Sequence, residues 1–430
     1  MNKIDWSSLW RKDDWWAVWI GFVILLLGVA HWLPSTPKFG KWLSVAQSLP
    51  DGLWGTLVPS ILLLVFIFVL TAIGMAFMKQ SIRRYLPGFL VIFCLGWFCW
   101  WLGNWKVLTQ YGLERVLWAL LVGLLISNIW RIPEWLKAGA QTEFYIKTGL
   151  VLLGAEILFQ TVIAGGVIGM GQALIVVLAV WFLGYWIFRR FGLSETFAAT
   201  MATGVSICGV SAAIAAGGAV KGNPKHVSYT ISLVLLCAIP MLIGMPYLAR
   251  AMGLDQTVAG AWIGGTIDTT GAVVAAGELV GEQGLQAAAL VKMAQNVLIG
   301  FWAFGLAIWA TLSLQRKPGG ERPGAIEIWY RFPKFIIGFV VASLLFSFVL
   351  IPTLGSDAVN GVLASTKSYR DWFFVFAFIS IGLQTRVKDL LTVGGGRPAL
   401  SFVLVQLFNI LWTLLVVWIL WSGIFWPSPI

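Results

Sequence analysis

The feature that most constrains this chain is a succession of long apolar segments, with no connection long enough for a soluble domain. Most of the segments reach the roughly 20 residues that a membrane-spanning helix needs. Hydrophobic residues occupy 59% of the 430 positions, and a soluble fold would not bury that much apolar surface. We therefore expect an all-α membrane protein with about thirteen transmembrane helices, at residues 14–33, 55–78, 86–103, 112–130, 144–165, 171–190, 196–219, 226–249, 257–280, 285–313, 332–352, 371–391 and 399–423.

The basic residues predict how these segments are oriented. With a cytoplasmic N-terminus, alternating loops place 20 of the 29 lysines and arginines inside, as the positive-inside rule requires. Lys367 and Arg370 then fall in an outer loop. We expect a multi-pass protein of the bacterial inner membrane with its C-terminus outside. The net charge of +11 is spread over short loops, so no nucleic-acid partner is predicted.

Two stretches near the middle of the chain resemble each other at an offset of 60 residues. Residues 204–217 read GVSICGVSAAIAAG, and residues 264–277 read GGTIDTTGAVVAAG. Paired hydrophobic segments interrupted by glycine are typical of transporters, whose helices break at the substrate site and expose backbone groups there. The alternative is that these small residues serve close helix packing. We predict two interrupted helices that meet each other.

Three ionisable residues lie well inside apolar segments: Glu156, Asp268 and Lys292. Charge in the membrane interior is costly, so each is a candidate functional group. Asp268 and Lys292 also fit a purely structural pair, and Glu156 fits either a proton site or an acid neutralised by a neighbour. Gln384, Gln406 and Asn409 are uncharged polar residues at similar depth.

A broken helix offers free N–H groups and a positive dipole end to an anion. Hydroxyl groups add donors, and Lys292 adds a mobile positive charge that Asp268 holds when no anion is bound. The expected substrate-binding residues are Ser206, Cys208, Gly209, Ser211, Thr266, Asp268, Thr269, Thr270, Lys292, Gln295 and Asn296. The expected coupling-ion or proton residues are Glu156, Asp268 and Gln384. Cys208 also fits the role of a small buried apolar residue.

Several function classes are disfavoured by composition. Only two histidines are present, and the four cysteines have no metal-ligand spacing, so neither a metal site nor a cofactor is predicted. A membrane-embedded enzyme is the less favoured alternative, because the chain lacks a histidine-based catalytic group and any sizeable soluble domain.

The ordered motifs SICGVSAAIAA (206–216), KHVSYTISLVLL (225–236), GTIDTTGAVVAAG (265–277) and ALVKMAQNVL (289–298) resemble the YeiH-type sulfate exporter family. This resemblance covers about residues 85–425 and implies a polytopic carrier related in architecture to inverted-repeat transporters. A weaker likeness of residues 151–166 to 379–395 also suggests internal repeats. The family typically has His and an acidic residue where this chain has Asp268 and Thr269, and an Arg near the position of Gln295. These departures favour a less charged anion or a different coupling.

The sequence thus predicts a secondary transporter that exports a small anion of the sulfate or sulfonate type. A cation/proton antiporter that uses Glu156 and Asp268 is the alternative. The expected partners are the anion, a coupling proton or sodium ion and the lipid bilayer, and a homodimer is left open. Residues 1–80 are expected to form a two-helix extension, and residues 81–430 the transporter core.

Overall fold

A computed structural model describes residues 7–44, 47–109, 115–157, 159–310, 329, 332–386 and 396–423. Within these ranges the secondary structure is helical, without a β-strand. The chain forms two compact units: unit 1 contains residues 163–333 and 387–430, and unit 2 contains residues 5–162 and 334–386. The expected all-α class is confirmed for the described residues.

Seven of the described helical segments are long and apolar enough to cross a membrane. They are α3 (Gly52–Phe77), α4 (Ile82–Leu102), α9 from Val162 to Arg190, α12 (Pro224–Ala251), α15 (Glu282–Trp309), the continuous segment Phe335–Leu354 and α21 (Arg397–Trp421). The thirteen spans expected from the sequence are therefore not confirmed. Two expected spans, 196–219 and 257–280, are each divided into two short helices, and two others contain helices of only 15 residues.

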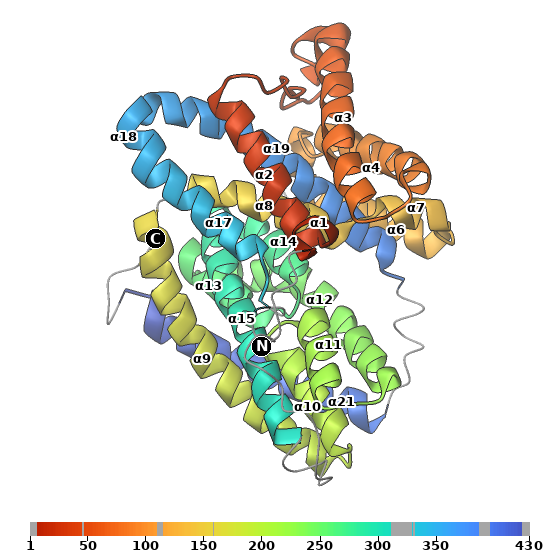
Figure 1. Ribbon diagram of the computed structural model, residues 1–430, viewed down its shortest axis with the longest axis vertical. Helices are drawn as coiled ribbons and strands as arrows, with labels where there is room; N and C mark the ends of the chain where they lie inside the picture. Colours follow the sequence, from red (N-terminus) through yellow and green to blue (C-terminus); the bar gives the residue numbers. More distant parts are fainter. Residues whose placement is uncertain are drawn as a thin grey trace. The chain divides into compact units, whose positions relative to one another are not determined.

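Unit 2 is built around α8 (Thr142–Glu156) and α19 (Ser356–Gln384), which pack against each other. The remaining helices of unit 2 are α1 (Ser8–Arg11), α2 (Asp13–Val29), α3, α4, α5 (Lys106–Thr109), α6 (Arg115–Ile129), α7 (Glu134–Gly139), α17 (Phe335–Leu344), the π-helix η3 (Leu345–Leu350) and α18 (Ile351–Leu354) (Figure 1). Aromatic rings fill the space between α4 and α19, where Phe93 and Trp372 stack with centroids 5.3 Å apart. The first helices thus belong to unit 2, because α2 packs on α8, α17 and α19. The expected boundary at residue 80, between a two-helix extension and the transporter core, stays a prediction.

Unit 1 is built around α15. Its other helices are α9 (Phe159–Arg190, of which residues 163–190 belong to this unit), α10 (Glu195–Ser206), α11 (Gly209–Ala219), α12, α13 (Gln256–Thr266), α14 (Thr270–Val280) and α21. In Figure 1, α13, α14 and α15 run close together in green to teal, and their contacts confirm the packing. A Cβ atom at Gly264 would lie 2.6 Å from the Ala288 carbonyl oxygen, so glycine permits this close approach of α13 to α15.

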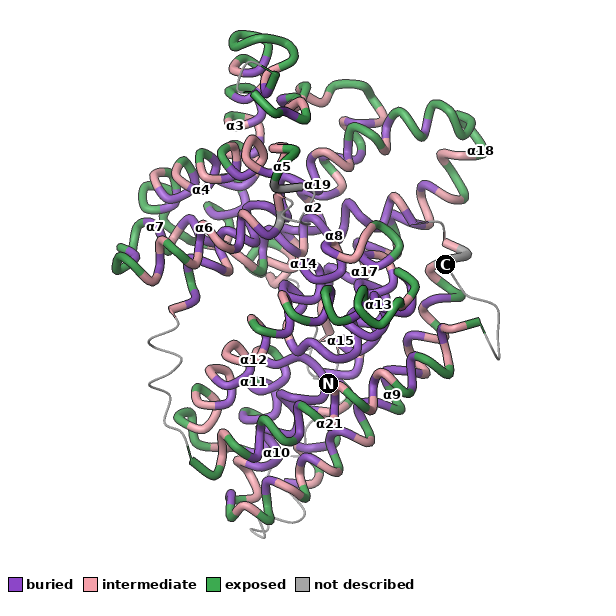
Figure 2. Tube along the Cα trace, turned by 180° about the vertical axis from the view of Figure 1, so that it is seen from behind, coloured by how far each residue is buried: buried purple, intermediate pink, exposed green. Residues whose placement is uncertain are grey.

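Burial distinguishes the centre of unit 1 from its periphery. In the most apolar stretch of α15, 61% of the residues are buried, against 33% for α9. Figure 2 shows buried and exposed residues mixed along α9. The first residue of α13, Gln256, is exposed, and every following residue from Thr257 to Thr266 is buried. The break between α13 and α14 therefore lies in the interior of unit 1, where irregular backbone is tolerated because protein surrounds it.

Candidate functional site

The first glycine-rich stretch is an interrupted helix. α10 ends at Ser206 and α11 begins at Gly209, with Ile207 and Cys208 between the two helices and Cys208 in an extended conformation. A Cβ atom at Gly209 would lie 2.0 Å from Cγ1 of Val234. Glycine is therefore required where the chain turns into α11 against α12.

The second glycine-rich stretch is interrupted at the matching place. α13 ends at Thr266 and α14 begins at Thr270, so Ile267, Asp268 and Thr269 form the break. The hydroxyl of Thr269 caps α14 by accepting a hydrogen bond of 3.3 Å from the backbone N–H of Ala272. Serine and threonine favour such caps because their hydroxyls replace the missing helical partner.

The two breaks touch. The backbone N–H of Gly209 donates to the carbonyl oxygen of Asp268 at 2.7 Å. The prediction of two interrupted helices that meet each other is confirmed. Fold and sequence agree here because glycine, serine and threonine make a helix break inexpensive where the flanking residues are apolar.

Side chains from α15 occupy the carbonyl ends that the breaks expose. The ammonium of Lys292 donates to the carbonyl oxygen of Ile207 at 2.7 Å and to Oε1 of Gln295 at 2.9 Å. Nε2 of Gln295 donates to the carbonyl oxygen of Gly265 at 3.0 Å. Lys292 makes no ion pair with Asp268 within the described part of the chain. Its charge instead lies at the C-terminal end of α10, where the helix dipole favours a cation.

Two amides of α21 complete this arrangement. Asn409 donates to the carbonyl oxygens of Val205 and Thr266, each at 3.3 Å, and Gln406 donates to that of Thr266 at 3.2 Å. The sequence alone identifies both only as polar residues at a similar depth. The signal for their role is a polar residue that recurs within one turn of an otherwise apolar helix.

Five buried side-chain oxygens at this crossing form no hydrogen bond with any described residue. They are Oγ of Ser206, Oγ1 of Thr266, Oδ2 of Asp268, Oδ1 of Asn296 and Oε1 of Gln406. An unsatisfied buried polar group costs about 1–3 kcal/mol. Such groups are rare in folded proteins, and their usual partner is an ordered water, an ion or a ligand. We call these five residues together with Lys292 the crossing site.

The remaining predicted binding residues occupy different positions. Cys208 is buried and precedes α11, and Thr270 accepts a hydrogen bond of 3.2 Å from Nδ2 of Asn296. Ser211 is exposed in the first turn of α11. The structure thus brings most of the predicted residues together but leaves Ser211 on the surface of unit 1.

Glu156, in unit 2, is the last residue of α8 and pairs with Nη1 of Arg370. Arg370 also donates to Oδ1 of Asp371 at 3.0 Å and 2.8 Å, and Arg115 donates to Oδ2 of Asp371 at 2.8 Å. The expectation that Arg370 lies in an outer loop is wrong: its side chain is fully buried within α19. These four residues are called the charge network below.

Gln384, the position related to Glu156 in the weaker repeat, lies at the exposed end of α19. It donates to the carbonyl oxygen of Ala140 at 2.5 Å and accepts from the hydroxyl of Thr142 at 3.1 Å. Residues 387–395 of that repeat lie outside the described residues. The internal repeat stays a prediction.

A family model described as conserved hypothetical protein 698 matches residues 87–401, and the similar proteins carry the name UPF0324 membrane protein. The chain belongs to this family. The relative from Rhodopirellula baltica is 41% identical and is aligned over 91% of this chain and 73% of its own length. A relative from Nitratidesulfovibrio vulgaris is 39% identical, over 90% of this chain and 66% of its own length.

A UPF0324 relative from Nitrosomonas europaea is 31% identical, and 99% of each chain is aligned. The chain spans about two thirds of the length of the Nitratidesulfovibrio relative. No solved structure shows significant similarity to it. Membership of the UPF0324 family and the apolar helices establish a membrane protein. The relatives' names contain no substrate, so the resemblance to YeiH-type sulfate exporters stays a prediction.

Proposed function

We propose that this protein is a secondary transporter that exports a small anion of the sulfate or sulfonate type, bound at the crossing site. The observation that carries the proposal is the position of Lys292 beside two helix breaks that touch. An ammonium has three donors, and Lys292 commits two of them, to Ile207 and Gln295. The third donor is available to an anion.

The uncommitted hydroxyls support the same proposal. Ser206 precedes Ile207 in the chain, and Thr266 precedes the second break. Their hydroxyls are buried without a described partner, and each is able to donate to an oxyanion. The amide group of Asn296 presents a donor instead of an oxygen if it is rotated, because its partner, the hydroxyl of Thr270, is able to donate as well as accept. The amide of Gln406 keeps its orientation, because its Nε2 donates to the carbonyl oxygen of Thr266.

The coupling ion is proposed to act at Asp268. Its Oδ2 is buried without a described partner and lies outside any ion pair with Lys292. A carboxylate in that position is stabilised by a proton or by a sodium ion, since sodium, like other hard cations, is ligated by oxygen. The same observation favours the alternative function, a cation/proton antiporter. Glu156 contributes less to that alternative, because Arg370 already neutralises it.

The test is flux into and out of proteoliposomes that contain the full chain. Labelled sulfate and methanesulfonate serve as probes, with imposed pH or sodium gradients. Anion flux that depends on a gradient is the expected result. Sodium or proton flux that does not require an anion would replace the proposal by the antiporter, and turnover of a chemical bond would indicate a membrane-embedded enzyme.

Two variants assign the roles at the crossing site. Lys292→Ala should abolish stabilisation of the detergent-solubilised protein by sulfate or methanesulfonate. Lys225→Ala, at an exposed lysine of α12, is the matched control. Unchanged anion affinity in folded Lys292→Ala protein would remove Lys292 from the site. Asp268→Asn should keep anion binding but lose the dependence of flux on the coupling gradient.

A further inference from the structure

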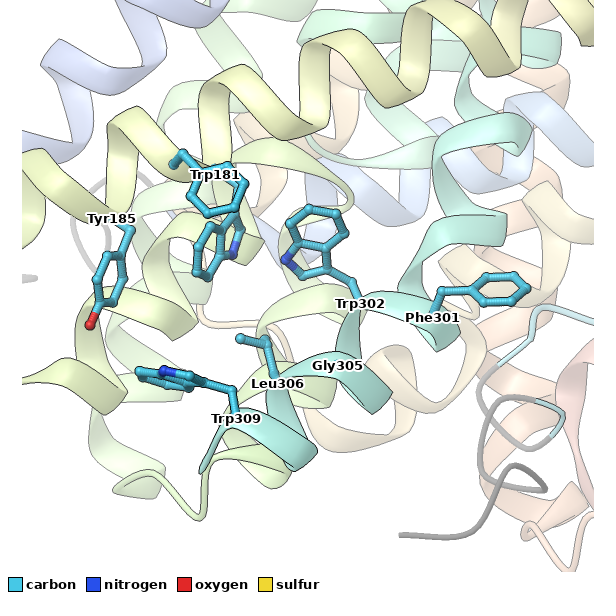
Figure 3. Close-up of a pocket in the computed structure, with 8 residues that line it drawn as sticks. Trp181, Tyr185, Phe301, Trp302, Gly305, Leu306 and Trp309 are labelled. Carbon is cyan, nitrogen blue, oxygen red and sulfur yellow. The ribbon is translucent and has the colours of Figure 1, made fainter. Parts of the chain in front are cut away.

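A hollow of about 590 Å³ lies between α9 and α15 in unit 1, and no residue of the crossing site lines it. This volume is within the range of about 300–1,000 Å³ that small-molecule sites occupy. Trp181 and Tyr185 of α9 face Trp302 and Trp309 of α15 across it (Figure 3). Both helices are apolar and long enough to cross a membrane. We call this hollow the aromatic groove.

The aromatic groove has two ends, and we call the end with the Tyr185 hydroxyl the polar end. Trp181 contacts Trp302 with ring centroids 5.7 Å apart, and Tyr185 contacts Trp309 at 6.1 Å. The C-terminal ends of α9 and α15 therefore lie at the same end of the groove. The polar tips of Tyr185, Trp302 and Trp309 form no hydrogen bond with a described residue, whereas Trp181 donates to Thr203 at 2.9 Å.

An arginine follows the polar end of the groove. Phe182 lines the groove, and Trp186 and Arg190 continue the same ridge at intervals of four residues. The guanidinium of Arg190 lies over the ring of Trp186, 5.5 Å from its centroid. Arg190 is exposed and, among the described residues, has no carboxylate partner. It is thus available for an anionic group at this end.

We propose that the aromatic groove binds an anionic phospholipid, with an acyl chain between α9 and α15 and the headgroup phosphate at Arg190. A phospholipid has long apolar acyl chains and a negatively charged headgroup. This matches the groove, where aromatic residues of α9 and α15 are followed by Arg190. Guanidinium groups bind phosphate through paired hydrogen bonds. Tyrosine and tryptophan suit the region between the acyl chain and the headgroup, because their rings are apolar and their tips donate hydrogen bonds.

The test is native mass spectrometry of the full chain, released from micelles that contain equal amounts of phosphatidylglycerol and phosphatidylcholine with the same acyl chains. The expected result is that bound phosphatidylglycerol exceeds phosphatidylcholine about fivefold, as one basic residue near a membrane surface produces. Arg190→Gln should reduce this preference to near equality. Arg84→Gln, at an exposed arginine of α4 in unit 2, should keep it.

A second variant fills the groove without disturbing the fold. A Cβ atom at Gly305 meets no atom within 4 Å, so Gly305→Leu places a side chain in the hollow and should remove both lipids. Gly244→Leu, on α12 at a glycine with equal space around its Cβ position, is the matched control.

Equal binding of the two lipids to the parent, or a preference that Arg190→Gln leaves intact, would overturn the proposal. A Gly305→Leu protein that keeps its lipids but loses a dimer would assign the groove to a second copy of the chain instead.

Discussion

Unit 1 and unit 2 both bury polar side chains among apolar helices, but they satisfy them differently. In the charge network of unit 2, Glu156, Arg370, Asp371 and Arg115 each have a partner of opposite charge. In the crossing site of unit 1, five buried oxygens have no partner among the described residues. A cluster whose charges are paired internally is suited to hold helices together. A cluster with open hydrogen-bonding capacity is suited to bind something that arrives and leaves.

The largest expected effect comes from breaking the charge network. Arg370→Met leaves Glu156 and Asp371 buried with their shared partner removed, and such a loss costs about 3–5 kcal/mol of unfolding free energy. We expect a large fall in the thermal unfolding temperature in detergent. Arg83→Met, at an exposed arginine of α4, is the control and should unfold like the parent.

A second substitution separates charge from packing in this prediction. Adding Glu156→Leu to Arg370→Met removes one of the stranded carboxylates and should restore part of the lost stability. An Arg370→Met protein as stable as the parent would show that the charge network does not hold unit 2 together.

A smaller loss of stability is expected when the hydrogen bonds between α21 and the two helix breaks of unit 1 are removed. Asn409→Leu removes the donor to the carbonyl oxygens of Val205 and Thr266. The buried carbonyl of Val205 then loses its side-chain partner, which costs about 1–3 kcal/mol, whereas the carbonyl of Thr266 keeps the hydrogen bond from Gln406. The thermal unfolding temperature should therefore fall even in the absence of any ligand. Leu411→Asn, at an exposed position of α21, tests whether an Asn/Leu exchange alone has this effect.

The crossing site was largely predictable because its chemistry is local. Glycine, serine and threonine cluster at both breaks, and Lys292, Gln295 and Asn296 follow within one long helix. The contribution of Asn409 was not predictable, because its partners lie 143 and 204 residues away in the chain. A single polar residue in an apolar span indicates burial against something, but the sequence does not say against what.

Of the charge network, the sequence predicts only the alternative that a neighbour neutralises Glu156, and it does not predict that the neighbour is Arg370. The sequence places Arg370 in an outer loop and Asp371 at the start of the membrane segment 371–391, because charge usually marks a loop. The helix α19 instead starts at Ser356 and continues through both residues to Gln384. Charged side chains are tolerated inside such a helix when they pair with each other, and pairing with Glu156 or Arg115 is not visible in the sequence.

The substitution Thr266→Val tests most directly how the crossing site differs from the charge network. It replaces an unpaired buried hydroxyl by a methyl group of similar size, so no described hydrogen bond is lost. The unliganded protein should change by no more than about 1 kcal/mol, and a gain in stability is the expected sign. Stabilisation by sulfate or methanesulfonate should become weaker, as measured by thermal shift. A marked loss of stability without ligand would show that Thr266 has a partner inside the protein, as the residues of unit 2 do.

The smallest effect concerns Lys334, a charged residue of unit 2 outside the charge network and before α17. Burial lowers the pKa of Lys334 to about 8, with Asp14 opposing and Lys12 adding to the shift. Below pH 8 the lysine is charged in both the folded and the unfolded chain. Between pH 8 and about 10.5 the unfolded chain binds a proton that the folded chain has lost, so this group makes the unfolding free energy rise with pH. The rise should stay below about 1 kcal/mol, which is less than a shift from 10.5 to about 8 would give by itself, because solvent screens a group at the end of a helix. It is measured as the difference in unfolding temperature between the parent and Lys334→Gln across this range, with exposed Lys38→Gln as the control. A parent and a Lys334→Gln protein with parallel pH curves would mean that Lys334 is as well paired as Arg370, and would extend internal charge pairing to this edge of unit 2.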